Sequence, residues 1–264
     1  MKKRNLISKK TKAVSEDVTA TINLSFFGQP LQIKTSVPTS KMRPKRMLPV
    51  FHNMTASFMD KTVERIHSEG MEISCTKGCG ACCRQMVPIS EIEAHRLCNL
   101  VNQMSEPRKS IISKRFAEAK ERMSEAGLLD KLQNSEQITK EEFRDLGLKY
   151  FEQGVACPFI EDESCSIHLD RPIVCREYLV VSPAENCRRL NGEPIKVLKI
   201  AFKMSEAIKC FNESKDKSDG LIPLILALEW AETHPENSPE RPGTEIFGEL
   251  LKNLTNGDVS EQAA

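Results

Sequence analysis

The stretch Cys75-Thr-Lys-Gly-Cys79-Gly-Ala-Cys82-Cys83-Arg84 places four thiols within nine residues. Glycines at positions 78 and 80 let the backbone turn tightly enough to direct several sulfur atoms toward one point. Cys79 and Cys82 form a CxxC knuckle, a spacing that binds zinc or an iron–sulfur cluster. Because adjacent side chains usually point apart, we expect Cys82 and Cys83 to serve different metals, which favours a polynuclear or two-site arrangement.

A second set of cysteines follows between residues 157 and 187, in a stretch rich in proline and charge. Its weak periodicity means that something other than apolar packing must fix it, and metal coordination can do so. We therefore expect the two sets to converge in space as metal ligands. The eight candidate ligands are Cys75, Cys79, Cys82, Cys83, Cys157, Cys165, Cys175 and Cys187. Eight thiolates suffice for two sites of four, or for one cluster and one structural ion.

Positive side chains are expected beside such a site, because four thiolates around zinc or an oxidised four-iron cluster leave about two net negative charges. The basic residues that flank the cysteines are Lys77, Arg84, Arg171, Arg176, Arg188 and Arg189. His168 is either a nitrogen ligand or a hydrogen-bond donor near the site. Cys98 and Cys210 fall at apolar helical positions and are expected to pack as small hydrophobes outside the site.

Composition indicates where the thiols operate. The basic N-terminus MKKRNLISKKTK has no apolar segment of a secretory signal, so we expect a cytoplasmic protein whose cysteines bind metal or catalyse rather than form disulfides. The longest apolar stretch, residues 221–231, is too short for a transmembrane segment. Residues 1–50 carry 11 Lys or Arg against two acidic residues. This basic arm is either a solvated tail or a contact for an acidic protein, an anionic lipid surface or nucleic acid; other partners are unknown.

Periodicity predicts a mainly α fold, in which helices carry irregular metal-binding cysteine loops and a small β-hairpin lies at the N-terminus. Alternating apolar residues predict the hairpin over residues 18–37, and the basic segment 41–46, broken by Pro44, is typical of a linker. Capping boxes at Ser90/Glu93 and Thr139/Glu142 each predict a helix start. The predicted helices cover residues 48–68, 91–101, 107–134, 140–153, 194–212, 221–232 and 244–254.

Three units follow from these patterns. Residues 1–47 form the basic arm and hairpin, residues 48–193 form the cysteine-cluster metal-binding domain, and residues 194–264 form a C-terminal helical extension packed on it. No internal repeat and no alternating strand–helix pattern is present.

Several motifs together resemble the YkgJ-type CxxxCxxCC cysteine-cluster family. They are the segment from Cys75 to Arg84, then Val87-Pro-Ile-Ser-Glu-Ile, Cys157-Pro-Phe-Ile, Cys165-Ser-Ile-His168 and Arg171-Pro-Ile-Val-Cys175-Arg-Glu-Tyr178. The similarity covers about residues 70–190. It implies a zinc- or iron-chelating or Fe-S-cluster-containing protein, with an iron-sulfur cluster or zinc as the cofactor. It names no reaction, so whether the protein is an enzyme is left open.

Two other functions compete with a plain metal-binding role. Cys75, Cys79 and Cys82 match the CxxxCxxC spacing of radical-SAM enzymes, but no βα repeat is present to build the barrel of those enzymes. A zinc-stabilised, non-catalytic adaptor using the basic arm is the third candidate, although the chain is poor in the aromatic residues that stack on bases. The identity of the metal would separate these functions.

Overall fold

The computed structural model describes residues 17–135, 138–189, 193–213 and 221–255. The helices are α1 (Leu48–Ser68), α2 (Glu91–Asn102), α3 (Glu106–Glu125), α4 (Leu129–Gln133), α5 (Lys140–Glu152), α6 (Ile173–Glu177), α7 (Met204–Ala207), α8 (Ala227–Thr233) and α9 (Gly243–Leu254). The 3₁₀ helices are η1 (Pro44–Met47), η2 (Ala81–Arg84), η4 (Ala184–Arg188), η5 (Ile208–Phe211) and η6 (Leu224–Leu226). Strands are β1 (Asp17–Phe26), β2 (Gln29–Pro38), β3 (Lys41–Met42), β4 (Pro88–Ile89), β5 (Ile160–Glu161), β6 (Ser164–Cys165), β7 (Ile222–Pro223) and β8 (Arg241–Pro242). This mainly α fold with a small hairpin confirms the predicted fold class.

The N-terminal hairpin is the longest strand pair in the described part of the chain. β1 and β2 pair in antiparallel register, with Ile22 opposite Ile33. Phe27 and Gly28 form the turn with positive φ angles of 47° and 81°, the geometry that matches the twist of a two-residue hairpin. Alternate residues are buried on one face, as the period-2 pattern predicts.

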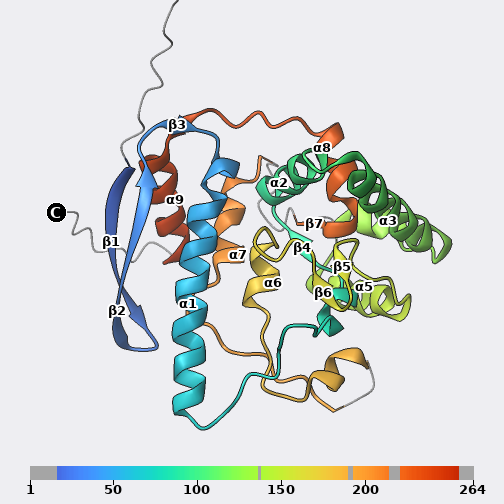
Figure 1. Cartoon of the computed structure of the whole chain (residues 1–264), viewed down its shortest axis with the longest axis horizontal. Coiled ribbons are helices and arrows are strands. Elements are labelled where there is room, and N and C mark those ends of the chain that lie inside the picture. Colours follow the sequence, from blue (N-terminus) through green and yellow to red (C-terminus); the bar gives the residue numbers. More distant parts are fainter. Residues whose placement is uncertain (1–16, 136–137, 190–192, 214–220, 256–264) are drawn as a thin grey trace, which may run out of the picture.

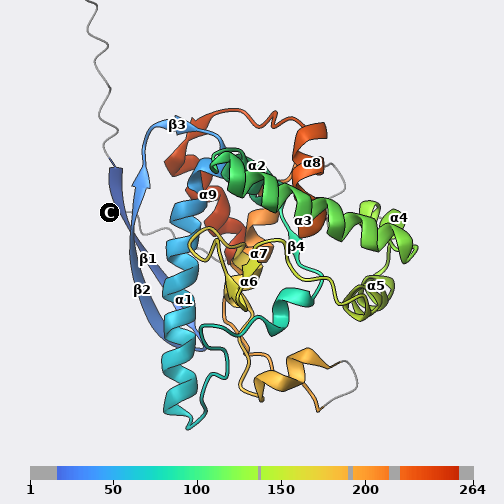
Figure 2. The ribbon, with the colours of Figure 1, turned by 45° about the vertical axis from the view of Figure 1, so that its right-hand side comes forward.

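The hairpin packs against α1 and α9 and closes the first hydrophobic core (Figures 1 and 2). Phe51 on α1 is fully buried in this core. Its ring stacks on Phe211 with centroids 5.7 Å apart. Ile173, at the start of α6, also belongs to this core. The segment that carries Cys175 is therefore attached to the hairpin end of the molecule.

A second core joins α2, α3, α4 and α5 on the opposite side of the molecule (Figures 1 and 2). The predicted capping box is present at the start of α2, where Glu93 accepts hydrogen bonds from the backbone and hydroxyl of Ser90. The other carboxylate oxygen of Glu93 accepts the Ile173 N–H at 2.8 Å. One buried carboxylate thus caps α2 and ties it to α6.

Four predictions of secondary structure are wrong. In the predicted helix 221–232, residues 222–223 form β7 because they pair with β4, and α8 begins only at Ala227, after the 3₁₀ helix η6. Residues 41–46 are not a linker, because β3 pairs with β8 and the following η1 buries Pro44. The predicted helix 107–134 is two helices, since Gly127 adopts a φ of +67° that ends α3 before α4. Within residues 194–212 only α7 and η5 are helical. The residues before α7 are not helical because Val197 forms a β-bridge with Val180 instead.

None of the helices in the described residues is long and apolar enough to span a lipid bilayer.

Candidate metal centre

A single cavity brings together the two cysteine sets that are distant in sequence. Its volume is about 510 Å³, and its lining includes all eight candidate ligands. These are Cys75, Cys79, Cys82, Cys83, Cys157, Cys165, Cys175 and Cys187. All ten cysteines are free thiols. The predicted convergence of the two sets is therefore present in the fold.

Short elements and turns, rather than long helices, position the thiols. Cys82 and Cys83 lie on η2, and Cys79 precedes it after Gly78, whose φ of +87° provides the turn expected from the sequence. Cys165 ends β6, Cys175 lies on α6 and Cys187 lies on η4. Two hydrogen bonds join the sets directly: the Cys157 N–H donates to the Cys83 carbonyl at 2.7 Å, and the Val180 N–H donates to Cys75 Sγ at 3.4 Å.

Gly80 explains how closely the two loops approach. A Cβ atom at this position would lie 2.5 Å from Ile160 Cδ1 and 2.7 Å from Glu163 Oε2. The same carboxylate receives two hydrogen bonds from Arg84, at 3.0 and 2.5 Å, and one from Arg188 at 3.5 Å. Glu163 therefore fastens η2 and η4 to the turn between β5 and β6.

The thiols regroup relative to their order in the chain. The charges of Cys75, Cys82 and Cys79 act to raise the pKa of Cys187, which packs in the same small apolar cluster as Cys75 and Cys79. Cys83 instead feels the charges of Cys157 and Cys175. The described structure thus has one end made of Cys75, Cys79 and Cys187, and another made of Cys83, Cys157, Cys165 and Cys175. Cys82 lies between them, since its charge affects thiols at both ends.

The expectation that Cys82 and Cys83 point apart is wrong, because their thiols hydrogen-bond to each other on η2. This hydrogen bond is the main reason that the pKa of Cys82 is lowered, to about 7. The pKa of Cys83 is raised for the same reason and by burial. Cys82 accordingly ionises more readily than the thiols whose pKa is raised.

Burial raises the pKa of most of the other thiols. It raises the pKa of Cys157 to about 12 and that of Cys175 well above its ordinary value. Cys75, Cys165 and Cys187 shift in the same direction for the same reason. A metal must therefore displace protons from these thiols, because the thiolate is the ligand.

Arg171 is the cation best placed to offset the charge of such thiolates. It lines the cavity and acts to lower the pKa of Cys75, Cys82, Cys165 and Cys175, against the effect of burial on all four. Its Nε atom is buried and has no hydrogen-bond partner in the described structure. A buried N–H of this kind is costly unless an anionic group accepts it. This donor and the eight thiols fit a group with negatively charged sulfur atoms.

The other predicted cations have different roles. Lys77 lines the cavity. Arg84 and Arg188 bind Glu163, and Arg176 donates to the carbonyls of Arg171 and Leu169 at 3.1 and 2.5 Å. Arg176 therefore holds the backbone that precedes Cys175, and its charge also acts on Cys165. The Arg189 side chain forms no hydrogen bond or ion pair with the described residues.

The other residues considered from the sequence fall into two groups, those that line the cavity and those that do not. His168 and Tyr178 line the cavity, and the Tyr178 hydroxyl accepts a hydrogen bond from Gln85 at 3.4 Å. Cys98 and Cys210 do not line it, as predicted, and Cys210 packs against the first core. Glu163 was missed by sequence reasoning. Its partners Arg84 and Arg188 are 79 and 25 residues away, so no local spacing indicates it.

The thiols surround space and do not form a closed shell. Within the described ranges, no three Cys, His, Asp or Glu side chains already stand at distances suited to holding a metal ion. A tetrahedral zinc site has Zn–S distances of about 2.3 Å, so its sulfur atoms nearly touch. The arrangement is instead a wide, thiol-lined chamber.

Comparison with known proteins identifies the class of the domain. Residues 74–193 match the model of the CxxCxxCC family, whose description is "Putative zinc- or iron-chelating domain". The matched segment contains all eight thiols and the loops that hold them, so the resemblance to a cysteine-cluster family is confirmed over this segment. The match spans less than half of the chain and supports metal binding by residues 74–193. Searches of curated proteins and of solved structures gave no significant match.

Proposed function

We propose that the chamber holds an iron–sulfur cluster and that Cys75, Cys79, Cys82, Cys83, Cys157, Cys165, Cys175 and Cys187 supply its ligands. The observation that carries this proposal is the chamber itself, a cavity of about 510 Å³ whose lining includes eight thiols. A cavity needs only about 10–15 Å³ to hold one water-sized sphere, and a lone four-coordinate zinc ion leaves no void among its ligands. A polynuclear group of iron and sulfide uses both the space and the number of thiols.

Such a cluster would supply one-electron transfer when bound. The chain's own residues define its surroundings. Arg171 offers a buried N–H donor with no protein acceptor, and the Val180 N–H already points at Cys75 Sγ. Hydrogen bonds to the sulfur atoms and nearby positive charge raise the reduction potential of a thiolate-ligated cluster. We therefore assign a redox-active role to the domain.

Metal and sulfide analysis of protein purified without air tests this proposal directly. We expect several iron atoms and a matching amount of acid-labile sulfide per chain, with visible absorption that bleaches on reduction. Stoichiometric zinc in a colourless protein, without sulfide after anaerobic reconstitution, would contradict the iron–sulfur proposal and favour the zinc-stabilised adaptor.

Single substitutions then test the ligand set. Cys83→Ser removes a thiol at one end of the chamber and Cys187→Ser removes one at the other, and Cys98→Ser outside the cavity is the matched control. A serine hydroxyl is nearly isosteric but does not ionise near neutral pH. We expect both cavity variants to lose iron and the control to retain it. Full cluster content in both cavity variants would remove support for the assignment.

A further inference from the structure

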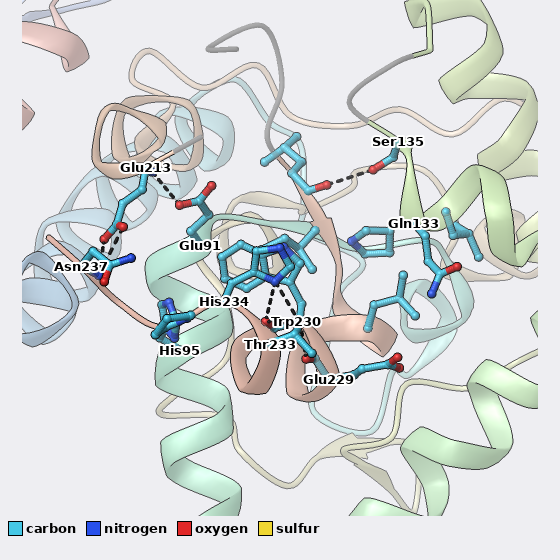
Figure 3. Close-up of a pocket in the computed structure, with 16 residues that line it drawn as sticks. Glu91, His95, Gln133, Ser135, Glu213, Glu229, Trp230, Thr233, His234 and Asn237 are labelled. Atoms are coloured by element: carbon cyan, nitrogen blue, oxygen red, sulfur yellow. Dashed lines mark hydrogen bonds between the residues drawn. The ribbon is translucent and has the colours of Figure 1, made fainter. Parts of the chain in front are cut away.

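A second large cavity lies away from the thiols, beside α2 and α8 (Figure 3). Its volume is about 620 Å³, within the range of small-molecule sites. It shares no lining residue with the thiol chamber. Whatever it binds therefore does not depend on the cluster proposed above.

Aromatic rings form the centre of this cavity. The Trp230 indole stacks on the His234 imidazole with centroids 4.6 Å apart and an interplanar angle of 3°. His95 from α2 meets the same indole edge-on at 5.4 Å. The His234 Nδ1 lies 2.9 Å from the Trp230 carbonyl, which holds the imidazole against the indole. Figure 3 shows Trp230 and His234 overlapping in the middle of the cavity, with His95 to one side.

Carboxylates give the same cavity a negative charge. Burial acts to raise the pKa of Glu213, but hydrogen bonds from Ser238 and Asn237 outweigh it and lower the pKa, so this side chain is anionic at neutral pH. The backbone N–H of Glu213 donates to Glu91 Oε2 at 2.6 Å, which fixes a second carboxylate against the backbone of Glu213 at the same wall. Glu229 lines the opposite wall and forms an ion pair with Lys120.

No lysine or arginine belongs to the lining in the described part of the chain. Burial lowers the pKa of His95, so this histidine is neutral near pH 7. Aromatic faces attract cations through their negative quadrupole, and nearby carboxylates add direct charge attraction. The volume far exceeds that of a bare metal ion, and no preformed metal-holding group occurs in the described residues.

We propose that this cavity binds an organic ammonium ion, with the alkylammonium group against Trp230 and its charge facing Glu213. The source of the cation is either a free amine or the lysine side chain of another protein. Both present the same positively charged nitrogen on an alkyl stem. The aromatic and carboxylate walls recognise that chemistry in either case.

Trp230 is the only tryptophan of the chain, so its fluorescence reports on this cavity alone. The titrants are choline, spermidine and a short lysine peptide, each at constant ionic strength. The controls are the uncharged carbon isostere of choline and the same peptide with its lysine acetylated. We expect a saturable fluorescence change with at least one cation, and binding at least about tenfold weaker for its uncharged counterpart. Calorimetry provides a second readout that does not depend on Trp230.

A matched pair of variants tests the charge. Glu213→Gln removes one negative charge and keeps an oxygen that accepts hydrogen bonds from Ser238 and Asn237. Glu232→Gln makes the same change on α8 outside the lining. We expect about fivefold weaker binding for the first variant and no change for the second.

The titrations also separate the two sources of the cation. Tighter binding of the lysine peptide than of choline or spermidine identifies a protein partner, and the reverse identifies a free amine. Equal binding of the cations and their uncharged counterparts, or no saturable response to any cation in both assays, would overturn the proposal.

Discussion

The hairpin end and the thiol chamber of this protein are stabilised by different means. The core formed by the hairpin, α1 and α9 contains 20 buried hydrophobic residues, including Phe51 and Ile246. The apolar cluster at the Cys75, Cys79 and Cys187 end of the chamber contains three, Ala81, Val180 and Cys187, whereas Cys157 and Cys165 at the other end pack against the second core. At the first end, free thiols, the ion pairs of Glu163 and single hydrogen bonds between loops stand in place of a large apolar core.

This difference indicates which part of the fold depends on metal. Apolar burial stabilises at roughly 25 cal/mol per Å², so a 20-residue core can fold without a ligand. Exposed or half-exposed ion pairs contribute about 0–1 kcal/mol each, and loops held mainly by them need a further source of stability. We propose that coordination by the thiols is that source, so metal should order the chamber and leave the hairpin core nearly unaffected.

The largest expected effect is therefore that of metal removal. Structural zinc in small peptides contributes about 10–16 kcal/mol of binding free energy coupled to folding, and a cluster with several thiolate ligands should act in the same direction. Cys79→Ser should lose the metal, and the backbone around η2 and η4 should exchange its amide hydrogens faster. Exchange in α1 should stay slow. Equal loss of protection in α1 would show that the two regions do not differ as described here.

Cys98→Ser is the control for that experiment, because Cys98 lies on α2 and outside the chamber. We expect full metal occupancy, with at most a modest loss of stability when a hydroxyl enters a helix face. Loss of metal in Cys98→Ser but not in Cys79→Ser would mean that the wrong thiols have been assigned.

The next effect in size is the pH dependence of metal binding. Burial raises the pKa of Cys157 to about 12, and it also raises the pKa values of Cys75 and Cys165. These thiols are therefore protonated at neutral pH without metal. Metal binding must release their protons, and affinity should fall as pH falls. Release of four protons would weaken apparent binding by about 10⁴-fold for each pH unit. Competition with a chelator at several pH values measures this slope.

The stability of the metal-free protein should change with pH in the opposite direction, and fall as pH rises. Thiols with raised folded pKa values stay protonated when those of the unfolded chain ionise, near pH 9. Their contribution to stability is thus complete below about pH 9 and is lost as pH rises further. Chemical unfolding of the metal-free protein between neutral and alkaline pH tests the sign, and greater stability at alkaline pH would contradict it.

A substitution in the hairpin core should lower the stability of the protein and leave its metal content unchanged. Phe51 is fully buried and stacks on Phe211, so Phe51→Ala should lower the free energy of unfolding by about 3–5 kcal/mol. The folded fraction should still bind as much metal per chain as the parent. Denaturant titration and metal analysis on the same sample measure both quantities, and a lower metal content in the folded fraction would mean that this core also shapes the chamber.

Local signals explain which parts of the fold could be predicted from sequence. Alternation gave the hairpin, and the capping boxes at Ser90 and Thr139 gave the starts of α2 and α5, because each signal lies within a few residues. The errors arose where distant contacts decide. Residues 41–42 become a strand only because residues 241–242 pair with them.

The candidate site shows the same limit. The sequence identified the eight thiols and their convergence, yet their grouping depends on the fold: Cys83 associates with Cys157 and Cys175, and Cys187 with Cys75. Sequence spacing orders ligands along the chain and carries no information on which loops meet. The cavity around Trp230 has no sequence signature either, since its walls come from α2, α4, β7 and α8, which are far apart in the chain.

Arg171 provides a smaller test of the chamber. Arg171→Gln should remove the positive charge and the partnerless Nε donor, and it leaves a shorter, neutral polar side chain. Loss of such a group near ligand sulfurs typically costs about 10–100-fold in metal affinity. We also expect a more negative reduction potential, with Arg171→Lys recovering part of the shift because the charge returns without the planar donor. Unchanged affinity and potential in Arg171→Gln would show that this guanidinium does not act on the metal centre.

The smallest expected effect is that of deleting residues 2–12, and it separates the basic arm from both regions compared above. This segment contains six Lys or Arg and no cysteine, histidine or carboxylate, so it offers a metal no ligand of the kind found in the chamber. Metal content and the free energy of unfolding should therefore equal those of the parent. Binding to an acidic polymer should weaken, and that difference should shrink as salt is added, because a lysine-rich arm acts through charge. Loss of metal on truncation, measured on anaerobically purified protein, would instead show that the arm contributes to the chamber, and the division of the molecule into an apolar core and a metal-dependent end would have to include it.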